Sequence, residues 1–331
     1  MRRVAGSAAL IGGLALAMSG AGPLCAQVET LDRVAVAEAV LLSELATAPD
    51  DAGEAWESRT LERLEAILDG TALPEPPTLA GTVGESRAHA ILARGNGFRR
   101  DVMTALAGED PEAAVAEVVR EYLNGGDGTL PAAPKNMDVL YDHGSAFAFR
   151  TRFPALRGLR WAGTWFGLAA TEPLTDLPPG PSRRAGVDTV TARYRAKLTP
   201  GEPPHAYPSE LPLAPAVAPG LVWASPEAAM IWDNHSMFVE VVADILSSLD
   251  VADRAAALDA AATFFTDPQR AVTSQLMWET MALRHGIFFQ GGFPLALMTR
   301  SERNRDGHGA HMRSGSPMVM PGMGGRTGGG T

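Results

Sequence analysis

The sequence predicts an α+β protein that is predominantly helical, with N- and C-terminal helical sections flanking a small antiparallel β-sheet. Three observations predict this fold class. Helix start signals recur along the chain, apolar residues recur every three or four positions in its first third, and two short central segments alternate apolar with other residues.

A capping residue, a proline and then Glu or Gln occur in succession at Asp110-Pro111-Glu112, Ser225-Pro226-Glu227 and Asp267-Pro268-Gln269. The side-chain oxygen of the first residue can accept a hydrogen bond from an unpaired amide of the first turn, and proline has no amide to leave unpaired. This pattern predicts helices over 111–123, 226–249 and 268–285. The apolar spacing adds a helix over 252–265 and a helical section over 29–123.

The central section is expected to form strands. Alternation places Phe147, Phe149, Thr151 and Phe153 on one face, and it places Val190, Ala192, Tyr194, Ala196 and Leu198 on another. The apolar segment 159–170 between them is interpreted as a third strand, with a helix as the alternative. We therefore divide the chain into a signal peptide (1–26), a helical section (27–130), a β-rich section (131–200), a proline-rich linker (201–220), a second helical section (221–300) and a disordered tail rich in Gly, Met and His (301–331).

The N-terminus predicts a periplasmic or secreted protein. Arg2 and Arg3 precede an uncharged apolar run that ends near Met18, and small residues follow, with cleavage expected after Ala26. Cleavage would remove Cys25, the only cysteine, so an internal disulfide is excluded. The apolar run is too short to span a bilayer comfortably and no later segment offers about 20 apolar residues, so we expect no stable membrane insertion.

The charge of the chain limits its partners. The full sequence has a formal net charge of -10, and loss of the two arginines of the signal peptide makes it more acidic. This charge argues against general binding to nucleic acid or to anionic membranes. A metal ion or a cationic partner is easier to accommodate.

The tail contains the sharpest chemical pattern. Within residues 308–323, two imidazoles and four thioethers occur together: His308, His311, Met312, Met318, Met320 and Met323. Copper(I) is a soft ion that favours these two ligand types, so the tail predicts a copper site. Asp306, His308 and His311 alone would instead suit nickel, zinc or copper(II), and the methionines favour copper(I). The competing interpretation is an ordinary disordered terminus in which methionine is common.

An alternative site lies in the helix expected at 226–249. His235 falls within its apolar stripe, and Asp233 and Glu240 belong to the adjacent stripe. An imidazole beside a carboxylate is what general acid–base catalysis needs, so a secreted enzyme is one alternative function. A structural core histidine is the simpler interpretation. Met281 and His285, one helical turn apart, could ligate copper or haem iron, but the favoured interpretation is that His285 caps the C-terminus of its helix and that Met281 packs in the core.

A third possibility is docking through a basic face. Arg150 and Arg152 lie on one expected strand, and Arg193, Arg195 and Lys197 lie on another. Such a face could bind an acidic protein partner in the periplasm, or it could be a solvated face that discourages edge pairing. The sequence contains no H-E-x-x-H, G-x-S-x-G, Walker or C-x-x-C motif. We therefore expect an exported, non-catalytic accessory or binding protein that binds or buffers copper through its tail.

Overall fold

The computed structural model describes residues 23–72, 74–75, 77–84, 86–198 and 211–289. Its regular elements in this part of the chain are helices. They are α1 (Pro23–Thr47), α2 (Glu54–Leu68), α3 (Leu79–Val83), α4 (Arg87–Leu106), α5 (Pro111–Leu123), the 3-10 helix η1 (Met137–Leu140), α6 (Ala148–Arg152), α7 (Pro154–Ala169), α8 (Glu172–Asp176), α9 (Pro181–Leu198), α10 (Ala214–Val217), α11 (Pro219–Ala224), α12 (Pro226–Ser247), α13 (Arg254–Thr266) and α14 (Gln275–Phe289).

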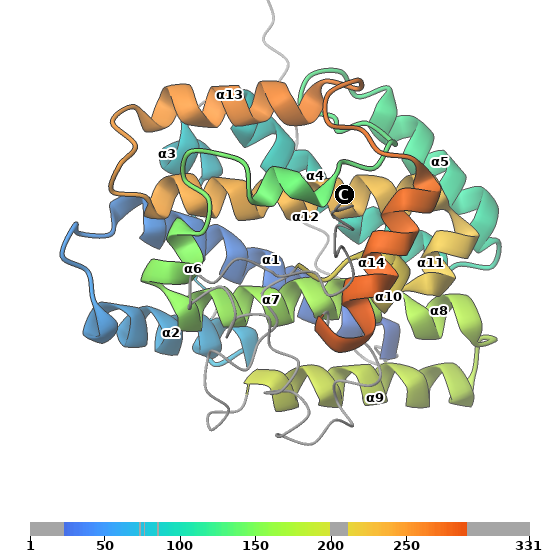
Figure 1. The fold of residues 1–331 in the computed structure, drawn as a ribbon. Coiled ribbons are helices and arrows are strands. Elements are labelled where there is room, and N and C mark those ends of the chain that lie inside the picture. Colours follow the sequence, from blue (N-terminus) through green and yellow to red (C-terminus); the bar gives the residue numbers. More distant parts are fainter. Residues whose placement is uncertain (1–22, 73, 76, 85, 199–210, 290–331) are drawn as a thin grey trace, which may run out of the picture.

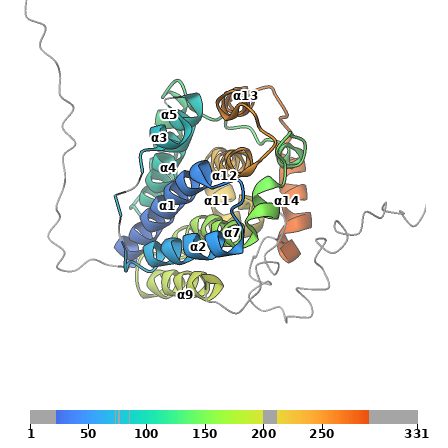
Figure 2. The ribbon, with the colours of Figure 1, turned by 90° about the vertical axis from the view of Figure 1, so that its left-hand side faces the viewer.

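Helix α12 is the centre of the fold. Figure 1 shows it running through the middle of the molecule, and in Figure 2 it is seen nearly end-on with the other helices around it. It packs against α1, α4, α6, α10, α11 and α13. Every residue from Ala228 to Ser247 is buried. A helix enclosed on all sides in this way has no solvent face, so each polar side chain on it needs a partner inside the protein.

The two predicted helical sections share one core. Buried apolar side chains form a single cluster that runs from Leu31 in α1 to Ala282 in α14. Helix α7 contributes a continuous buried run from Leu156 to Ala169, and it packs against α2 and α9. No described helix combines the length and apolar character that a bilayer crossing requires.

The predicted antiparallel sheet is wrong. The described residues contain no strand, and their only ladder contact is an isolated bridge between Lys135 and Val272. The three segments expected as strands form helices α6, α7 and α9 instead. In α9 the buried residues Val187 and Tyr194 are seven positions apart, which is two helical turns, whereas Ala192 of the predicted strand face is exposed.

The start of α7 explains the error at residues 147–153. Proline at the first helical position begins a helix at Pro154, and the residue before it, Phe153, is held out of the helical region at φ -134° and ψ 67°. The alternating segment is thereby divided into the short helix α6 and a break. Four alternating positions are too few to outweigh a strong local start signal.

Two of the three predicted helix starts are confirmed. The side chain of Asp110 accepts a hydrogen bond from the Ala113 amide at 3.3 Å, and Ser225 does the same for the Ala228 amide at 3.2 Å. The start predicted at Asp267 is wrong, because its carboxylate accepts from the Gln269 amide at 2.9 Å and forms a turn. Helix α14 begins eight residues later, at Gln275, and ends at Phe289 rather than at residue 285.

The proline-rich segment 201–220 is described from Leu211 onward. We expected an extended surface connection, but Leu211 and Leu213 are buried and the chain then forms α10 and α11 against α12. This described portion therefore belongs to the core. The predicted signal peptide up to residue 22 and the predicted tail lie outside the described residues.

Candidate functional site

Helix α12 carries an unusual load of polar side chains for a fully enclosed helix. They are Asp233, Asn234, His235, Ser236, Glu240, Asp244 and Ser247. Burying such groups is costly unless each is hydrogen-bonded or paired with an opposite charge. The partners of these side chains therefore show which elements of the fold α12 contacts through polar groups.

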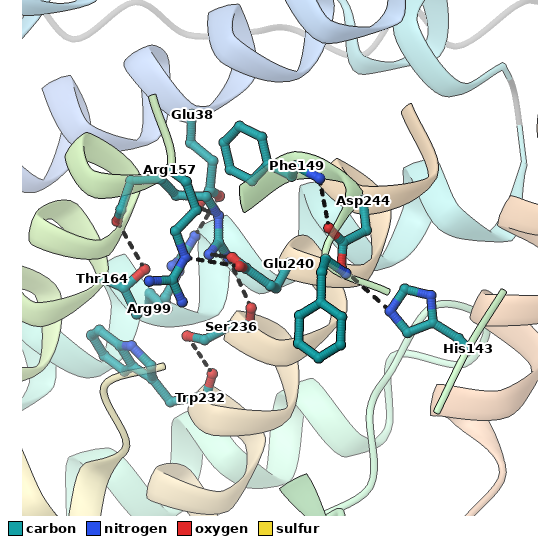
Figure 3. Close-up of polar contacts among 12 residues, drawn as sticks. Glu38, Arg99, His143, Phe149, Arg157, Thr164, Trp232, Ser236, Glu240 and Asp244 are labelled. Atoms are coloured by element: carbon teal, nitrogen blue, oxygen red, sulfur yellow. Dashed lines mark hydrogen bonds and ion pairs between the residues drawn. The ribbon is translucent and has the colours of Figure 1, made fainter. Parts of the chain in front are cut away.

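Glu240 is the centre of a buried ionic cluster, which we define as Glu38, Arg99, Arg157, Arg160 and Glu240 (Figure 3). Arg157 Nε donates to Glu240 Oε1 at 3.1 Å, and Arg160 Nη1 donates to the other carboxylate oxygen. Arg160 Nη2 also donates to the Ser236 carbonyl at 2.8 Å. Both arginines come from α7, so this contact fixes α7 against α12.

The ionic cluster continues toward α1 and α4. Arg99 of α4 donates to Glu38 of α1 at 3.0 Å, and Arg160 Nε lies 3.9 Å from the second oxygen of Glu38. Four helices thus meet through charged side chains in the interior. Removing any one partner would leave an uncompensated buried charge, so the charged side chains of these four helices depend on one another.

The charge state of Glu240 follows from these contacts. Burial alone would raise the pKa of its carboxyl group, but the nearby charges of Arg157 and Arg160 outweigh burial and lower the pKa below its usual value. Glu240 is therefore ionised at neutral pH, as the two guanidinium partners require.

Asp244, one helical turn further along α12, holds the chain that leads into α6. Its carboxylate accepts hydrogen bonds from the amides of Phe149 at 2.9 Å and Phe147 at 3.3 Å. His143 Nε2 lies 3.4 Å from Asp244 Oδ2, and Figure 3 shows the ring directed at the carboxylate. Burial raises the pKa of Asp244, and the contact with His143 and the Phe149 amide oppose that shift.

Phe147 has a backbone conformation that a bulky residue rarely adopts. Its φ is +71°, in the left-handed region. Its ring stacks on Tyr141, with centroids 5.6 Å apart, and the Arg150 guanidinium lies 4.6 Å from its centroid. Such strain persists only where surrounding contacts enforce it, and here the hydrogen bonds to Asp244 do so.

A cleft opens beside this strained residue. It is lined by Leu140, Tyr141, Phe147, Arg150, Arg157, Glu240 and Asp244. Its cavity volume is about 20 Å³, which is room for about one water molecule. A second cavity of about 20 Å³ touches other members of the ionic cluster, Glu38 and Arg160. The cluster therefore lies between two openings in the helical body.

The structure encloses His235, the residue at the centre of the predicted acid–base site. The His235 ring has no exposed surface and packs directly on the Gly95 backbone, where an added Cβ would lie 1.6 Å from its Cδ2. Burial lowers its pKa well below the usual value, the charges of Arg99 and Arg160 add to this, and the Leu92 carbonyl opposes it. A catalytic base must reach its substrate, and this neutral ring is enclosed.

The carboxylates that the sequence suggested as partners of His235 contact other groups instead. Asp233 accepts hydrogen bonds from the Ala214 amide at 2.9 Å and from the Trp278 indole at 2.9 Å, and burial raises its pKa well above the usual value. Glu240 belongs to the ionic cluster. The side chain of Met281 is half-buried on α14, and the side chain of His285 lies outside the described residues.

The basic residues predicted to share a sheet face lie on two helices. Arg150 and Arg152 belong to α6, and Arg193, Arg195 and Lys197 belong to α9. Arg152 donates to the backbone carbonyls of Ser247 at 3.1 Å and Asp50 at 2.9 Å, so its guanidinium group joins the end of α12 to the connection between α1 and α2. Lys197 Nζ lies 4.5 Å from the centroid of the Trp165 ring.

The predicted metal ligands of the tail, His308, His311, Met312, Met318, Met320 and Met323, all lie outside the described residues. Within the part of the chain that the structure describes, no three His, Cys, Asp or Glu side chains are grouped so as to hold a metal ion.

Sequence analysis identified Glu240 and Asp233 as candidate site residues, but it gave no site role to His143, Asp244, Arg157 or Arg160. Asp244 lies four residues after Glu240 on the stripe already noted, which was an available signal. Arg157 and Arg160 lie beside and within the apolar segment 159–170, and a charge in an apolar segment is a signal that could have pointed to a buried ion pair. His143 gives no sequence signal, because it lies in an irregular turn far along the chain from Asp244.

Comparisons with protein families, with curated proteins and with solved structures found no match to this chain.

Proposed function

We propose that this chain is an exported, non-catalytic binding protein that takes up copper(I) through its C-terminal His- and Met-rich segment and buffers or delivers it. The observation that carries the proposal is the ligand set of residues 308–323. Six imidazole and thioether donors within sixteen residues match the preference of a soft monovalent ion.

In this proposal the described helical body carries the copper-binding segment and does not itself bind the metal. Its central helix directs Glu240, Asp233 and Asn234 into contacts with other elements of the same chain. Asn234, for example, accepts from the Lys135 amide at 3.0 Å and donates to the carbonyls of Pro131 and Ala133. These groups organise the fold, and the proposal assigns ligand binding to the segment beyond it.

The experiment is a competition titration of the full chain with copper(I) against a chromogenic copper(I) chelator under reducing conditions. We compare the wild type, a chain truncated after Arg305, and a variant in which the four tail methionines are replaced by leucine. Leucine keeps the apolar bulk and removes the sulfur donor. Met277→Leu is the matched control, because Met277 is 53% exposed on α14 and lies outside the tail.

The proposal predicts that the wild type and Met277→Leu withdraw copper from the chelator, whereas the truncated chain and the four-leucine variant do not. Equal retention by the truncated chain would place the metal elsewhere and would contradict the proposal. Retention by the four-leucine variant, with zinc bound as tightly as copper, would favour the harder site of Asp306, His308 and His311.

A further inference from the structure

Helix α14 carries apolar side chains on two opposite faces, and Figure 2 shows it at the edge of the helical body. Its inner face is buried: Trp278 is 2% exposed, and its indole donates to Asp233 at 2.9 Å, which holds the helix on the fold. On its outer face Leu276, Met277 and Leu283 are 73%, 53% and 49% exposed. An amphipathic surface helix normally has polar side chains on that face.

Exposed apolar side chains are concentrated around this helix. Of the seven large apolar side chains that are exposed in the described part of the chain, four lie within residues 272–283. A group of exposed apolar side chains on one surface is typical of a site that another group covers. The outer face of α14, which we define as Leu276, Met277 and Leu283, therefore has the character of a docking surface.

The sequence that follows this face is itself apolar. Residues 286–299 include no charged side chain, although charged residues make up 20% of the whole chain. The large apolar residues that follow Gly291-Gly292 in this stretch are Phe293, Leu295, Leu297 and Met298. Apolar side chains of this kind are stabilised by leaving water, and so short an uncharged stretch is not long enough to cross a bilayer. The segment and the outer face of α14 can satisfy each other.

The length of the segment matches the length of the face. Helix α14 ends at Phe289, and Met277 lies about 18 Å before that end at 1.5 Å per residue. The six residues 293–298 reach about 20 Å when extended. Gly291-Gly292 allows the chain to reverse, because glycine adopts positive φ without strain. Attachment through so short a turn also gives the segment a higher effective concentration at α14 than a second copy of the chain would have.

We propose that residues 293–298 dock in extended form, antiparallel to α14, on the outer face of that helix. The apolar side chains of the segment then cover Leu276, Met277 and Leu283. Docking fixes the place from which the C-terminal His- and Met-rich segment leaves the helical body. The contact requires no copper, and the function proposed above neither depends on it nor excludes it.

The rate of oxidation of Met277 measures whether its thioether is covered. Copper-free full chain is treated with dilute hydrogen peroxide in the presence of EDTA, and peptide mass spectrometry follows the sulfoxide at Met277. Free methionine in the same solution gives the reference rate. Because the protein contains no copper, a negative result here leaves the copper titration unaffected, and the two proposals fail separately.

The wild type is compared with three altered chains. The segment variant, Phe293→Asp with Leu295→Asp and Leu297→Asp, removes the apolar surface at constant length. The matched control, Ser301→Asp with Ser314→Asp and Ser316→Asp, adds the same number of charges at polar positions of the same terminus. The third chain is truncated after Gly292. Circular dichroism verifies that each chain is folded, and light scattering gives its mass.

We expect Met277 to be oxidised at least about fivefold more slowly in the wild type than in the segment variant, because only the undocked chain reacts and a fivefold difference corresponds to docking for about four-fifths of the time. The serine control keeps the wild-type rate, and the truncated chain reacts as fast as the segment variant.

Either of two results would overturn the proposal. Equal rates in the wild type and the segment variant would mean that residues 293–298 do not cover the outer face of α14. Protection of Met277 that rises with protein concentration, together with a dimer mass in light scattering, would mean that a second copy of the chain covers the face instead.

Discussion

Replacing Glu240 by Gln tests the buried ionic cluster without changing its packing. Glutamine has nearly the same shape as glutamate, but it removes the charge that Arg157 and Arg160 share. Both arginines are 5% exposed, so neither can turn to solvent. Breaking a buried charge pair by removal of one partner costs about 3–5 kcal/mol, and we expect a loss in that range for Glu240→Gln at pH 7.

The control is a surface pair of the same chemistry. Arg63 pairs with Glu44, and the side chain of Arg63 is 55% exposed. Exposed pairs contribute about 0–1 kcal/mol, so Glu44→Gln should change the free energy of unfolding by less than about 1 kcal/mol. Urea unfolding followed by circular dichroism measures both variants under identical conditions.

The pH dependence provides a second measurement. Because Arg157 and Arg160 lower the pKa of Glu240 in the folded state, its contribution is present above its unfolded value of 4.5 and is lost as the pH falls through the lower folded value. The difference between the wild type and Glu240→Gln should therefore shrink in acid. Equal, small losses for Glu240→Gln and Glu44→Gln at pH 7 would refute the reasoning.

Other predictions concern neighbouring groups. Burial raises the pKa of Asp233, so its charged form destabilises the fold above the unfolded value of 3.8; Asp233→Asn should be neutral or stabilising in urea unfolding at pH 8, and a loss above about 2 kcal/mol would contradict this. Gly95→Ala should cost about 1–3 kcal/mol through its clash with His235, and a double-mutant cycle with His235→Ala should recover most of it; strict additivity would exclude the clash. Lys135→Met should cost about 1–3 kcal/mol, because Lys135 Nζ donates to the carbonyls of Asp267 at 2.5 Å and Arg270 at 2.6 Å, and an unchanged urea midpoint would argue against that role.

Local signals in the sequence predicted helix starts correctly where a hydrogen bond between groups close together in the sequence forms the cap. Asp110 and Ser225 each cap a helix as expected, because the capping atom and its amide partner are three residues apart. The same signal failed at Asp267. There the carboxylate accepts a hydrogen bond from the amide of Gln269, only two residues further along the chain, and a turn forms in place of a helix. Cap patterns thus indicate where the chain turns but do not always decide whether a helix follows.

The central section could not be predicted because its pattern was ambiguous. Residues 190–198 fit a strand period of two, but Val187 and Tyr194 also fit a helical spacing of seven, and packing of α9 against α7 and α1 selects the second. An apolar run such as 159–170 has no periodicity that separates a buried strand from a buried helix.

The ionic cluster shows a second limit of sequence analysis. Glu240 was recognisable as a carboxylate on a helix stripe, yet its partners Arg157 and Arg160 are 83 and 80 residues away along the chain. Only the packing of α7 on α12 brings them together. Likewise, nothing local indicates the left-handed backbone of Phe147, which depends on hydrogen bonds to Asp244, 97 residues away.

The most direct test of copper binding is the metal content of the protein isolated from cells that express the full sequence, from the exported fraction in which we propose that it resides. The protein is purified without added metal, and copper and zinc are measured beside the chain truncated after Arg305. We predict copper in the full chain at a clear excess over zinc, and its loss from the truncated chain. Copper at the same level in both chains, or in neither, would contradict the account.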